Sequence, residues 1–213
     1  MIPILSCKEA FALDKITIDS GHLSEKKLMD NAGRYIAQFI TEYILDPFNQ
    51  QFVVLAGPGN NGLDGIICHH YLLEYGVNTQ LLLINEEIAT SWVFKEYSIS
   101  DDSVSIYTNK YIFSPENYLI DGIFGIGLKR DIEGQYKNIL RKISKYPHII
   151  SIDIPSGIYG NSGVTSKNYI QAEFTLSIGY PKLGHYFNMG LESTGDLFKL
   201  DIGFKPLKNI DNY

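Results

Sequence analysis

The sequence predicts an α/β fold in which helices cover both faces of a mostly parallel sheet. Apolar runs of strand length recur along the chain, and segments with helical periodicity lie between several of them. Some runs, such as residues 80–84, are continuously apolar, which is typical of strands buried on both faces. Strands that alternate with helices form a parallel, doubly wound sheet. A chain of 213 residues is long enough for a sizeable core, and we expect one domain over residues 1–213.

Two helices are predicted before the first strand. Ser6 is a candidate N-cap for a helix over residues 7–20, which Gly21 ends. Ser24 is a candidate N-cap for a longer helix over residues 24–45, whose apolar residues recur at i, i+4 spacing. This order argues mildly against a dinucleotide-binding dehydrogenase, which more often opens with a strand and its glycine fingerprint.

The first strand runs directly into a glycine-rich loop. Residues 52–56 are apolar, residues 57–65 are rich in glycine and asparagine, and a helix is expected to begin near Asp64. This layout presents backbone N–H groups and a helix N-terminus to a phosphate. The loop also fits the G-x-G-x-x-G pattern, with Glu86 and Glu87 after the next apolar run. A tight turn without a ligand is the alternative for this loop.

The later elements continue the alternation of strands and helices. Apolar residues at i, i+3, i+4 and i+7 predict a helix that starts at Gly134, and residues 91–100 are compatible with another helix. The remaining strands are expected at residues 80–84, 104–107, 118–124, 148–152, 174–178 and 197–202.

Composition and charge argue against several classes of protein. The net charge is −6, so there is no overall positive surface for nucleic acid or an anionic membrane. No apolar run reaches the ~18 residues that span a bilayer, and the first residues carry no basic lead of a signal peptide. Cys7 and Cys68 form no metal pattern, and two isolated thiols favour a reducing compartment. We therefore expect a cytoplasmic protein.

Four loops are expected to meet at one crevice. In open α/β sheets, ligands bind beyond the carboxyl ends of the strands. Glycine accompanies polar or charged side chains at these ends, in residues 57–65, 121–131, 153–157 and 179–184. This convergence is a stronger indication of a site than any single motif.

The charged residues of these loops have plainer alternative roles. The alternative role of Asp121 is to cap a neighbouring loop, and that of Asp153 is to form a turn. Neither role needs a ligand. Lys182 is either part of the crevice or a solvated surface lysine. Lys129 and Arg130 face either a ligand phosphate or water.

The sequence contains neither a transition-metal motif nor the nucleophile elbow of acyl transfer. Its five histidines show no metal-ligand spacing, and the adjacent His69 and His70 face different sides of a helix. Ser156 lies outside a G-x-S-x-G pattern. The oxygen-rich glycine loops suit a hard cation better, if a metal is bound at all.

Five segments together carry a family resemblance. They read Leu-Met-Asp-Asn-Ala-Gly at 28–33, Ala-Gly-Pro-Gly-Asn-Asn-Gly-Leu-Asp-Gly at 56–65, Asp-Gly-Ile-Phe-Gly-Ile-Gly-Leu at 121–128, Ile-Asp-Ile-Pro-Ser-Gly at 152–157 and Pro-Lys-Leu-Gly at 181–184. In these segments the chain resembles the NAD(P)H-hydrate epimerase family, also called the YjeF N-terminal domain. The resemblance extends from about residue 5 to residue 204.

The resemblance implies a Rossmann-like three-layer α/β/α sandwich, commonly a homodimer. It also implies an isomerase that interconverts the R and S forms of hydrated NADH and NADPH in cofactor repair, before a separate ADP- or ATP-dependent dehydratase acts on the S form. The potassium ligands that it implies are Asn61, Asp121 and Ser156. The candidate substrate-binding residues, with Lys182 added from its strand-exit loop, are Asn60, Asn61, Gly62, Leu63, Asp64, Gly125, Ile126, Gly127, Leu128, Lys129, Arg130, Asp131, Asp153 and Lys182.

Two residues depart from the family pattern. Leu63 stands where the family usually has a second glycine, and leucine would be strained there if that position required positive φ or close approach to a phosphate. Asp131 stands where the family often has proline. In many bacterial relatives a dehydratase domain follows at about residue 204, so we expect a stand-alone epimerase here.

The implied reaction needs proton transfer. Inversion of the hemiaminal carbon C6 requires either loss and return of water or ring opening and closure. Asp153 is the predicted catalytic acid/base because it lies at a strand exit, and Asp64 is the weaker candidate because it is expected to cap its helix. Two other functions remain open. One is a non-catalytic nucleotide- or protein-binding module of the same fold, and the other is an NAD(P)-dependent oxidoreductase with Glu86 or Glu87 on a ribose.

Overall fold

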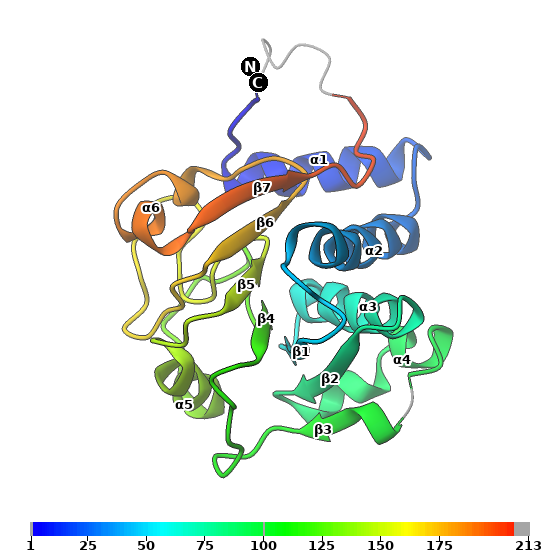
Figure 1. Cartoon of the computed structure of the whole chain (residues 1–213). Helices are drawn as coiled ribbons and strands as arrows, with labels where there is room; N and C mark the ends of the chain where they lie inside the picture. Colours follow the sequence, from blue (N-terminus) through cyan, green and yellow to red (C-terminus); the bar gives the residue numbers. More distant parts are fainter. Residues whose placement is uncertain (1, 100, 207–213) are drawn as a thin grey trace.

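The computed structural model describes residues 2–99 and 101–206, which build a seven-stranded sheet with helices on both faces (Figure 1). The strands are β1 (Gln51–Ala56), β2 (Asn78–Leu83), β3 (Val104–Ile106), β4 (Tyr118–Gly122), β5 (Ile149–Ile152), β6 (Phe174–Ile178) and β7 (Asp196–Leu200). The helices are α1 (Cys7–Asp19), α2 (Glu25–Tyr43), α3 (Asn60–Glu74), α4 (Trp92–Glu96), α5 (Gly134–Ile143) and α6 (Met189–Ser193). Short 3-10 turns are η1 (Glu86–Thr90), η2 (Asp101–Ser103) and η3 (Leu183–His185). The strand order is β3-β2-β1-β4-β5-β6-β7, with every pair parallel, which confirms the predicted fold class.

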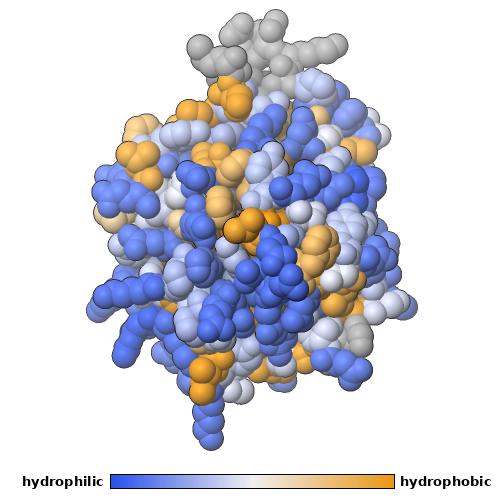
Figure 2. Space-filling model, viewed as in Figure 1, coloured by the Kyte–Doolittle hydropathy of each residue, from blue (hydrophilic) through white to orange (hydrophobic). Residues whose placement is uncertain are grey.

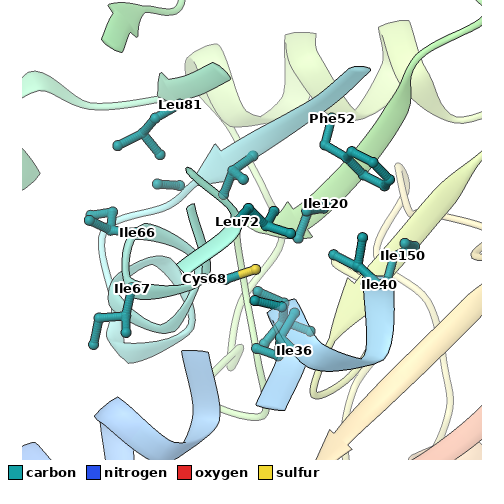
Figure 3. Close-up of a cluster of buried hydrophobic side chains, with 14 of the residues drawn as sticks. Ile36, Ile40, Phe52, Ile66, Ile67, Cys68, Leu72, Leu81, Ile120 and Ile150 are labelled. Carbon is teal, nitrogen blue, oxygen red and sulfur yellow. The ribbon is translucent and has the colours of Figure 1, made fainter. Parts of the chain in front are cut away.

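Two hydrophobic cores lie on opposite faces of the sheet. Phe52 and Val54 of β1 belong to the core under α2, α3 and α4, whereas Val53 and Leu55 belong to the core under α5. Strands buried on both faces explain the continuous apolar runs of the sequence. In the close-up of the first core, Cys68 of α3 lies among isoleucine and leucine side chains (Figure 3).

The order of the strands changes direction at β1. This strand pairs with β2 on one side and with β4 on the other, so consecutive parts of the chain extend the sheet in opposite directions (Figure 1). Such a topological switch point leaves a crevice at the carboxyl ends of the two strands. The loops that follow β1 and β4 border that crevice.

Gly57 allows these two loops to pack together, and Gly62 allows the first loop to fold back on itself. A Cβ atom on Gly57 would lie 1.9 Å from the carbonyl oxygen of Ile123, and one on Gly62 would lie 2.0 Å from the carbonyl oxygen of Gly57. Neither position has room for a side chain, so glycine is required by backbone packing. Part of the G-x-G-x-x-G pattern therefore has a structural explanation that needs no ligand.

α1 covers the carboxyl edge of the sheet rather than one of its faces. Just before this helix, the N–H of Leu5 donates to the carbonyl oxygen of Pro181 at 2.8 Å, and its own carbonyl accepts from the N–H of Leu183 at 2.9 Å. A small hydrophobic cluster also packs this helix against the loops at the carboxyl ends of the strands. Its members are Leu5, Ala10, Leu13, Ile126, Tyr180 and Phe204.

The predicted start of α3 is wrong. The helix begins at Asn60, because Gly59 occupies the N-cap position with an extended backbone (φ −106°, ψ −170°) and both asparagines lie in the first turn. Asp64 is therefore in the helix interior and does not cap it. Leu63 packs partly buried against the first core and is not among the residues with positive φ, so the expected backbone strain is not found.

Other boundaries differ by a few residues. β4 ends at Gly122 rather than at residue 124, because the carboxylate of Asp121 accepts the N–H of Ile123 at 3.2 Å and turns the chain. β7 covers 196–200 instead of 197–202. Within the helix expected over 91–100 only α4 is helical, and residue 100 lies outside the described residues.

The surface is mixed in character. On the face drawn in Figure 2, hydrophobic residues form small groups among polar ones. Exposed apolar side chains come from several parts of the chain, for example Leu45, Ile112 and Leu191. Over the described ranges, no helix has both the length and the apolar character that crossing a bilayer requires.

Candidate active site

A cavity of about 550 Å³ opens at the carboxyl edge of the sheet, beside the switch point. This volume is typical of small-molecule sites. The loops after β1, β4, β5 and β6 contribute to it, and α1 and α2 supply further wall. The predicted site residues that line the cavity are Asn60, Asn61, Asp64, Gly125, Ile126, Gly127, Leu128, Lys129, Arg130, Asp153 and Lys182.

The remaining predicted residues lie elsewhere. Gly62 packs on the backbone of Gly57, and Leu63 packs on the first core. Asp131 is exposed and accepts a hydrogen bond from the hydroxyl of Tyr159 at 3.4 Å. Asp121 and Ser156 are fully buried beneath the cavity loops. Glu86 and Glu87, which an oxidoreductase would use on a ribose, follow β2 and are not part of the cavity wall.

One end of the cavity is suited to an anion. The first N–H groups of α3, those of Asn60 and Asn61, have no acceptor within the described part of the chain. The first turn contains no acidic residue, and Lys129 and Arg130 line the same cavity. Free N–H groups, the helix dipole and two cations together attract negative charge.

Asp153 and Lys182 form a buried ion pair in the cavity wall. Lys182 is only 2% exposed. Its ammonium contacts Oδ1 of Asp153 and donates to the carbonyl of Ile178 at 2.7 Å and to Oγ of Ser177 at 3.2 Å. All three ammonium protons therefore have partners. The alternative of a solvated surface lysine is wrong, because the chain folds Lys182 inward against the end of β6.

Asp153 is held in an uncommon backbone conformation. Its φ of 66° lies in the left-handed region, which non-glycine residues adopt at a cost of roughly 1–3 kcal/mol. Its N–H donates to the carbonyl of Leu176 at 2.8 Å, and its carbonyl accepts from Nε2 of His185 at 2.9 Å. Strain of this kind is often found at functional sites.

His185 was not predicted from the sequence. Its Nδ1 accepts the N–H of Lys182 at 3.1 Å while Nε2 donates to Asp153, a pattern that assigns the neutral ring with its proton on Nε2. Burial, and then the charge of Lys182, lowers the pKa of His185 to about 4. A histidine three residues after Lys182 was the only signal in the sequence.

A second buried carboxylate lies beneath the cavity. Asp121 accepts hydrogen bonds from Oγ of Ser156 at 2.6 Å, from the N–H of Ser156 at 2.8 Å, from Oγ of Ser151 at 3.0 Å and from the N–H of Ile123 at 3.2 Å. Burial raises the pKa of Asp121, and these donors oppose the rise. Ser156 also accepts the N–H of Phe124 at 2.9 Å.

Asn61 connects this network with the cavity. Its Nδ2 donates to the carbonyl of Ile152 at 3.0 Å, whereas no hydrogen bond to its Oδ1 exists among residues 2–99 and 101–206. A Cβ on Gly125 would lie 3.1 Å from this oxygen and 3.4 Å from Oδ2 of Asp153. The free amide oxygen and the carboxylate of Asp153 therefore lie on the same side of the loop after β4.

Two more carboxylates face the cavity. Asp64 of α3 lies one turn after Asn61, on the same side of the helix. Burial, followed by the charges of Asp153 and Asp14, raises its pKa well above the usual range. Asp14 of α1 was missed, although an acidic residue beside Leu13 on an apolar helix stripe was a visible signal.

These observations define a doubly wound α/β protein with a ligand-sized cavity at its switch point, lined by carboxylates and a buried lysine. The family model described as YjeF-related protein N-terminus matches residues 25–184, and the chain belongs to this family.

Relatives and one solved structure agree with this family. The bifunctional NAD(P)H-hydrate repair enzyme Nnr of Thermofilum pendens is 28% identical over 204 residues, which cover 90% of this chain but 38% of that protein. An NAD(P)H-hydrate epimerase of Entamoeba histolytica is 30% identical over 201 residues, which cover 91% of this chain and 87% of that protein. The crystal structure of yeast ynu0 matches 99% of this chain and 97% of that one with a TM-score of 0.76 at 23% identity, a likeness that shows the fold.

Proposed function

We propose that this chain is an epimerase that interconverts the R and S forms of hydrated NADH and NADPH. Relatives whose length the chain largely covers carry the name NAD(P)H-hydrate epimerase. The single observation that carries the proposal is the Asp153–Lys182 pair in the cavity wall. It supplies an oriented carboxylate beside a site of suitable size, which is what proton transfer to and from a hydrated ring requires.

The cavity supports one orientation of the dinucleotide. Its phosphates would lie at the first turn of α3, where the N–H groups of Asn60 and Asn61 are free, and Lys129 and Arg130 of the same cavity lining would add positive charge. The hydrated nicotinamide ring would then lie toward Asp153. Apolar wall suited to the ring comes from α1 and α2, through residues such as Leu13, Leu28 and Met29.

Asp153 is the proposed acid/base at C6. A carboxylate in this position accepts the proton of a water that adds to C6, or returns a proton to the hydroxyl that leaves. Its backbone is fixed on both sides by Leu176 and His185, so the carboxylate is held ready for transfer. Lys182 holds Oδ1 and leaves Oδ2 toward the loop of Gly125.

A potassium ion fits the residues beneath the cavity. Asn61 presents a free Oδ1. Ser156 gives its proton to Asp121 and accepts the N–H of Phe124, which leaves one lone pair, and the carbonyl of Phe124 lies 3.2 Å from that hydroxyl. An all-oxygen set of this kind suits a hard cation. We propose that Asn61, Asp121 and Ser156 hold it. When bound, a monovalent ion supplies charge that orders the surrounding loops and is a weak Lewis acid.

Assembly and pathway position follow from the same proposal. The relative from Thermofilum pendens is named bifunctional, which supports coupling of this chain to a separate ADP- or ATP-dependent dehydratase. We also propose a homodimer and action in a reducing compartment such as the cytoplasm. The two buried, free cysteines, Cys7 and Cys68, accord with that compartment.

A coupled assay tests the function. A mixture of R and S hydrated NADH is given to an S-specific dehydratase, with and without this protein. Rapid consumption of the R form only when the protein is present supports the epimerase. If the R form persists at its spontaneous rate while the protein binds a dinucleotide, the binding-module function is favoured instead. Hydride transfer to a carbonyl substrate would favour the oxidoreductase.

A further inference from the structure

Asp14 is a half-buried carboxylate that has no part in the proton transfers proposed for Asp153. It lies on α1 beside Leu13 and one turn after Ala10, which pack toward the cavity loops, and it lines the same cavity as Asp153. Within residues 2–99 and 101–206, its carboxylate takes part in no hydrogen bond or ion pair. An unpartnered carboxylate in an apolar wall has a desolvation cost, so its position calls for a role in the cavity.

The helix that carries Asp14 is anchored at both ends. At its start, Leu5 bridges the backbone on both sides of Lys182, and the N–H of Cys7 donates to Oδ1 of Asn161 at 2.7 Å. Near its end, Oγ1 of Thr17 accepts the N–H of Lys205 at 3.1 Å. α1 is therefore a fixed wall of the cavity, attached to the same strand-exit loop that supplies Lys182. A side chain on such a helix holds its position well.

The surroundings of Asp14 combine both signs of charge. Burial, followed by the negative charge of Asp153, raises the pKa of Asp14 to about 6. Asp64 is more than nine-tenths buried and has no hydrogen bond among the described side chains. Burial, followed by the charges of Asp153 and Asp14, raises its pKa as well. The charged groups that face Asp14 or share its cavity are Glu25 of α2, Asp64 of α3, Lys129 and Arg130 after β4, Asp153 after β5 and Lys182 after β6.

Inversion at C6 by loss and return of water needs a proton donor where the hydroxyl leaves and an acceptor where the water returns. Those two positions lie on opposite faces of the ring. Asp153 comes from the sheet edge, whereas Asp14 comes from α1, so the two carboxylates belong to different walls of one cavity.

We propose that Asp14 is a second catalytic acid/base of the epimerisation and acts on C6 from the α1 wall while Asp153 acts from the sheet edge. The inference rests on the proposed function. In one direction, protonated Asp14 gives its proton to the C6 hydroxyl, the C–O bond breaks with its electron pair on oxygen, and water leaves. The ring nitrogen lone pair forms the C=N bond. Water then adds to C6 on the other face, the C=N pair returns to nitrogen, and the proton of that water goes to Asp153.

The test compares Asp14→Asn with Asp14→Glu and with Asp19→Asn in the full chain. Asp19 is on the same helix but exposed, in a surface pair with Lys15, and is the matched control. For wild type, kcat/KM should fall above about pH 6, where Asp14 loses its proton. This fall in kcat/KM should be the same for conversion of R to S and of S to R, because the equilibrium between the two forms does not depend on pH. Rates are corrected for the reaction without protein, and thermal unfolding is followed for each variant.

We expect Asp14→Asn to lower kcat roughly 10²-fold, with KM little changed, the fall near pH 6 abolished and the melting temperature retained. Asp14→Glu should recover part of kcat and the pH dependence. An Asp14→Asn variant with wild-type kcat and pH profile would overturn the proposal. So would an Asp14→Asn variant in which only KM rises, or a loss of kcat in Asp19→Asn equal to that in Asp14→Asn. A profile abolished by Asp64→Asn and not by Asp14→Asn would also overturn it. Absence of epimerisation in wild type and in Asp19→Asn is instead the failure of the proposed function.

Discussion

Asp121 and Asp153 are buried carboxylates at the ends of neighbouring strands, but their surroundings differ. Asp121 accepts four hydrogen bonds from neutral donors and lies beneath the cavity. Asp153 meets a buried ammonium on one oxygen and faces the cavity with the other. The first arrangement satisfies the carboxylate with neutral donors, and the second leaves one carboxylate oxygen toward the cavity, where we propose that it exchanges a proton with the substrate. Burial alone therefore does not distinguish these two carboxylates, whereas the nature of their hydrogen-bond partners does.

Lys182→Met should have the largest effect on stability. It keeps the side-chain bulk but leaves the charge of Asp153 uncompensated, and removal of one partner from a buried pair costs about 3–5 kcal/mol. Urea denaturation measures this loss. The matched control is Lys199→Met, which removes the cation of the more exposed pair with Asp201 and should cost less than about 1 kcal/mol.

The double variant Asp153→Asn with Lys182→Met sharpens this result. With both charges removed, part of the lost stability should return, because the penalty belongs to the isolated carboxylate. A double variant that is no more stable than Lys182→Met alone would contradict the claim that the uncompensated charge of Asp153 causes the loss of stability.

The second largest effect should be on the loss of stability in acid, which is expected to be smaller in His185→Gln than in wild type. The unfolded chain protonates His185 below about pH 6.5, whereas the folded chain resists protonation until about pH 4. The stability that this residue contributes is complete above pH 6.5 and is lost as the pH falls toward 4, by up to about 3 kcal/mol. Denaturation at pH 7 and pH 4.5 should therefore show a smaller acid loss for His185→Gln than for wild type.

His69 gives the control for this prediction. It is fully buried on α3, away from the cavity, and burial lowers its pKa to about 4 as well. His69→Gln should reduce the acid loss by a similar amount while epimerisation is retained. Equal acid dependence in wild type and both variants would refute the role assigned to the neutral rings.

Asp121→Asn should have a smaller effect than these. One acceptor oxygen becomes an NH₂ donor that faces other donors, including Ser151 and Ser156, which costs about 2 kcal/mol. Among the described residues no lysine or arginine donates to Asp121, so no second variant that removes a protein cation is expected to restore this loss. Urea denaturation beside Asp19→Asn measures the difference. A cost as small as that of the exposed control would contradict a structural role for Asp121.

The sequence predicted the fold better than the site. Continuous apolar runs and glycine-terminated strands were enough to predict the sheet and the convergence of loops, because strands buried on both faces and strand ends leave local patterns in the sequence. The start of α3 was misjudged, since asparagine and glycine usually lie in loops and in this chain form the first helical turn.

The missed residues share a physical reason. His185 and Asp14 reach the cavity only through tertiary contacts, namely the docking of η3 on Asp153 and of α1 on the loop of Lys182. Asp131 was expected at the substrate because the family resemblance assigns the whole loop of residues 125–131 to binding, and its side chain is exposed and accepts a hydrogen bond from Tyr159. Spacing along a loop does not determine which side chains face inward.

The most direct test of the proposed mechanism is the epimerisation rate of Asp153→Asn, measured in samples whose binding of hydrated NADH is followed by calorimetry. We expect retained binding and a rate lowered by about 10²–10⁴-fold, with Asp19→Asn equal to wild type. A variant that binds and epimerises at the wild-type rate would contradict the assignment of Asp153 as the acid/base of this cavity.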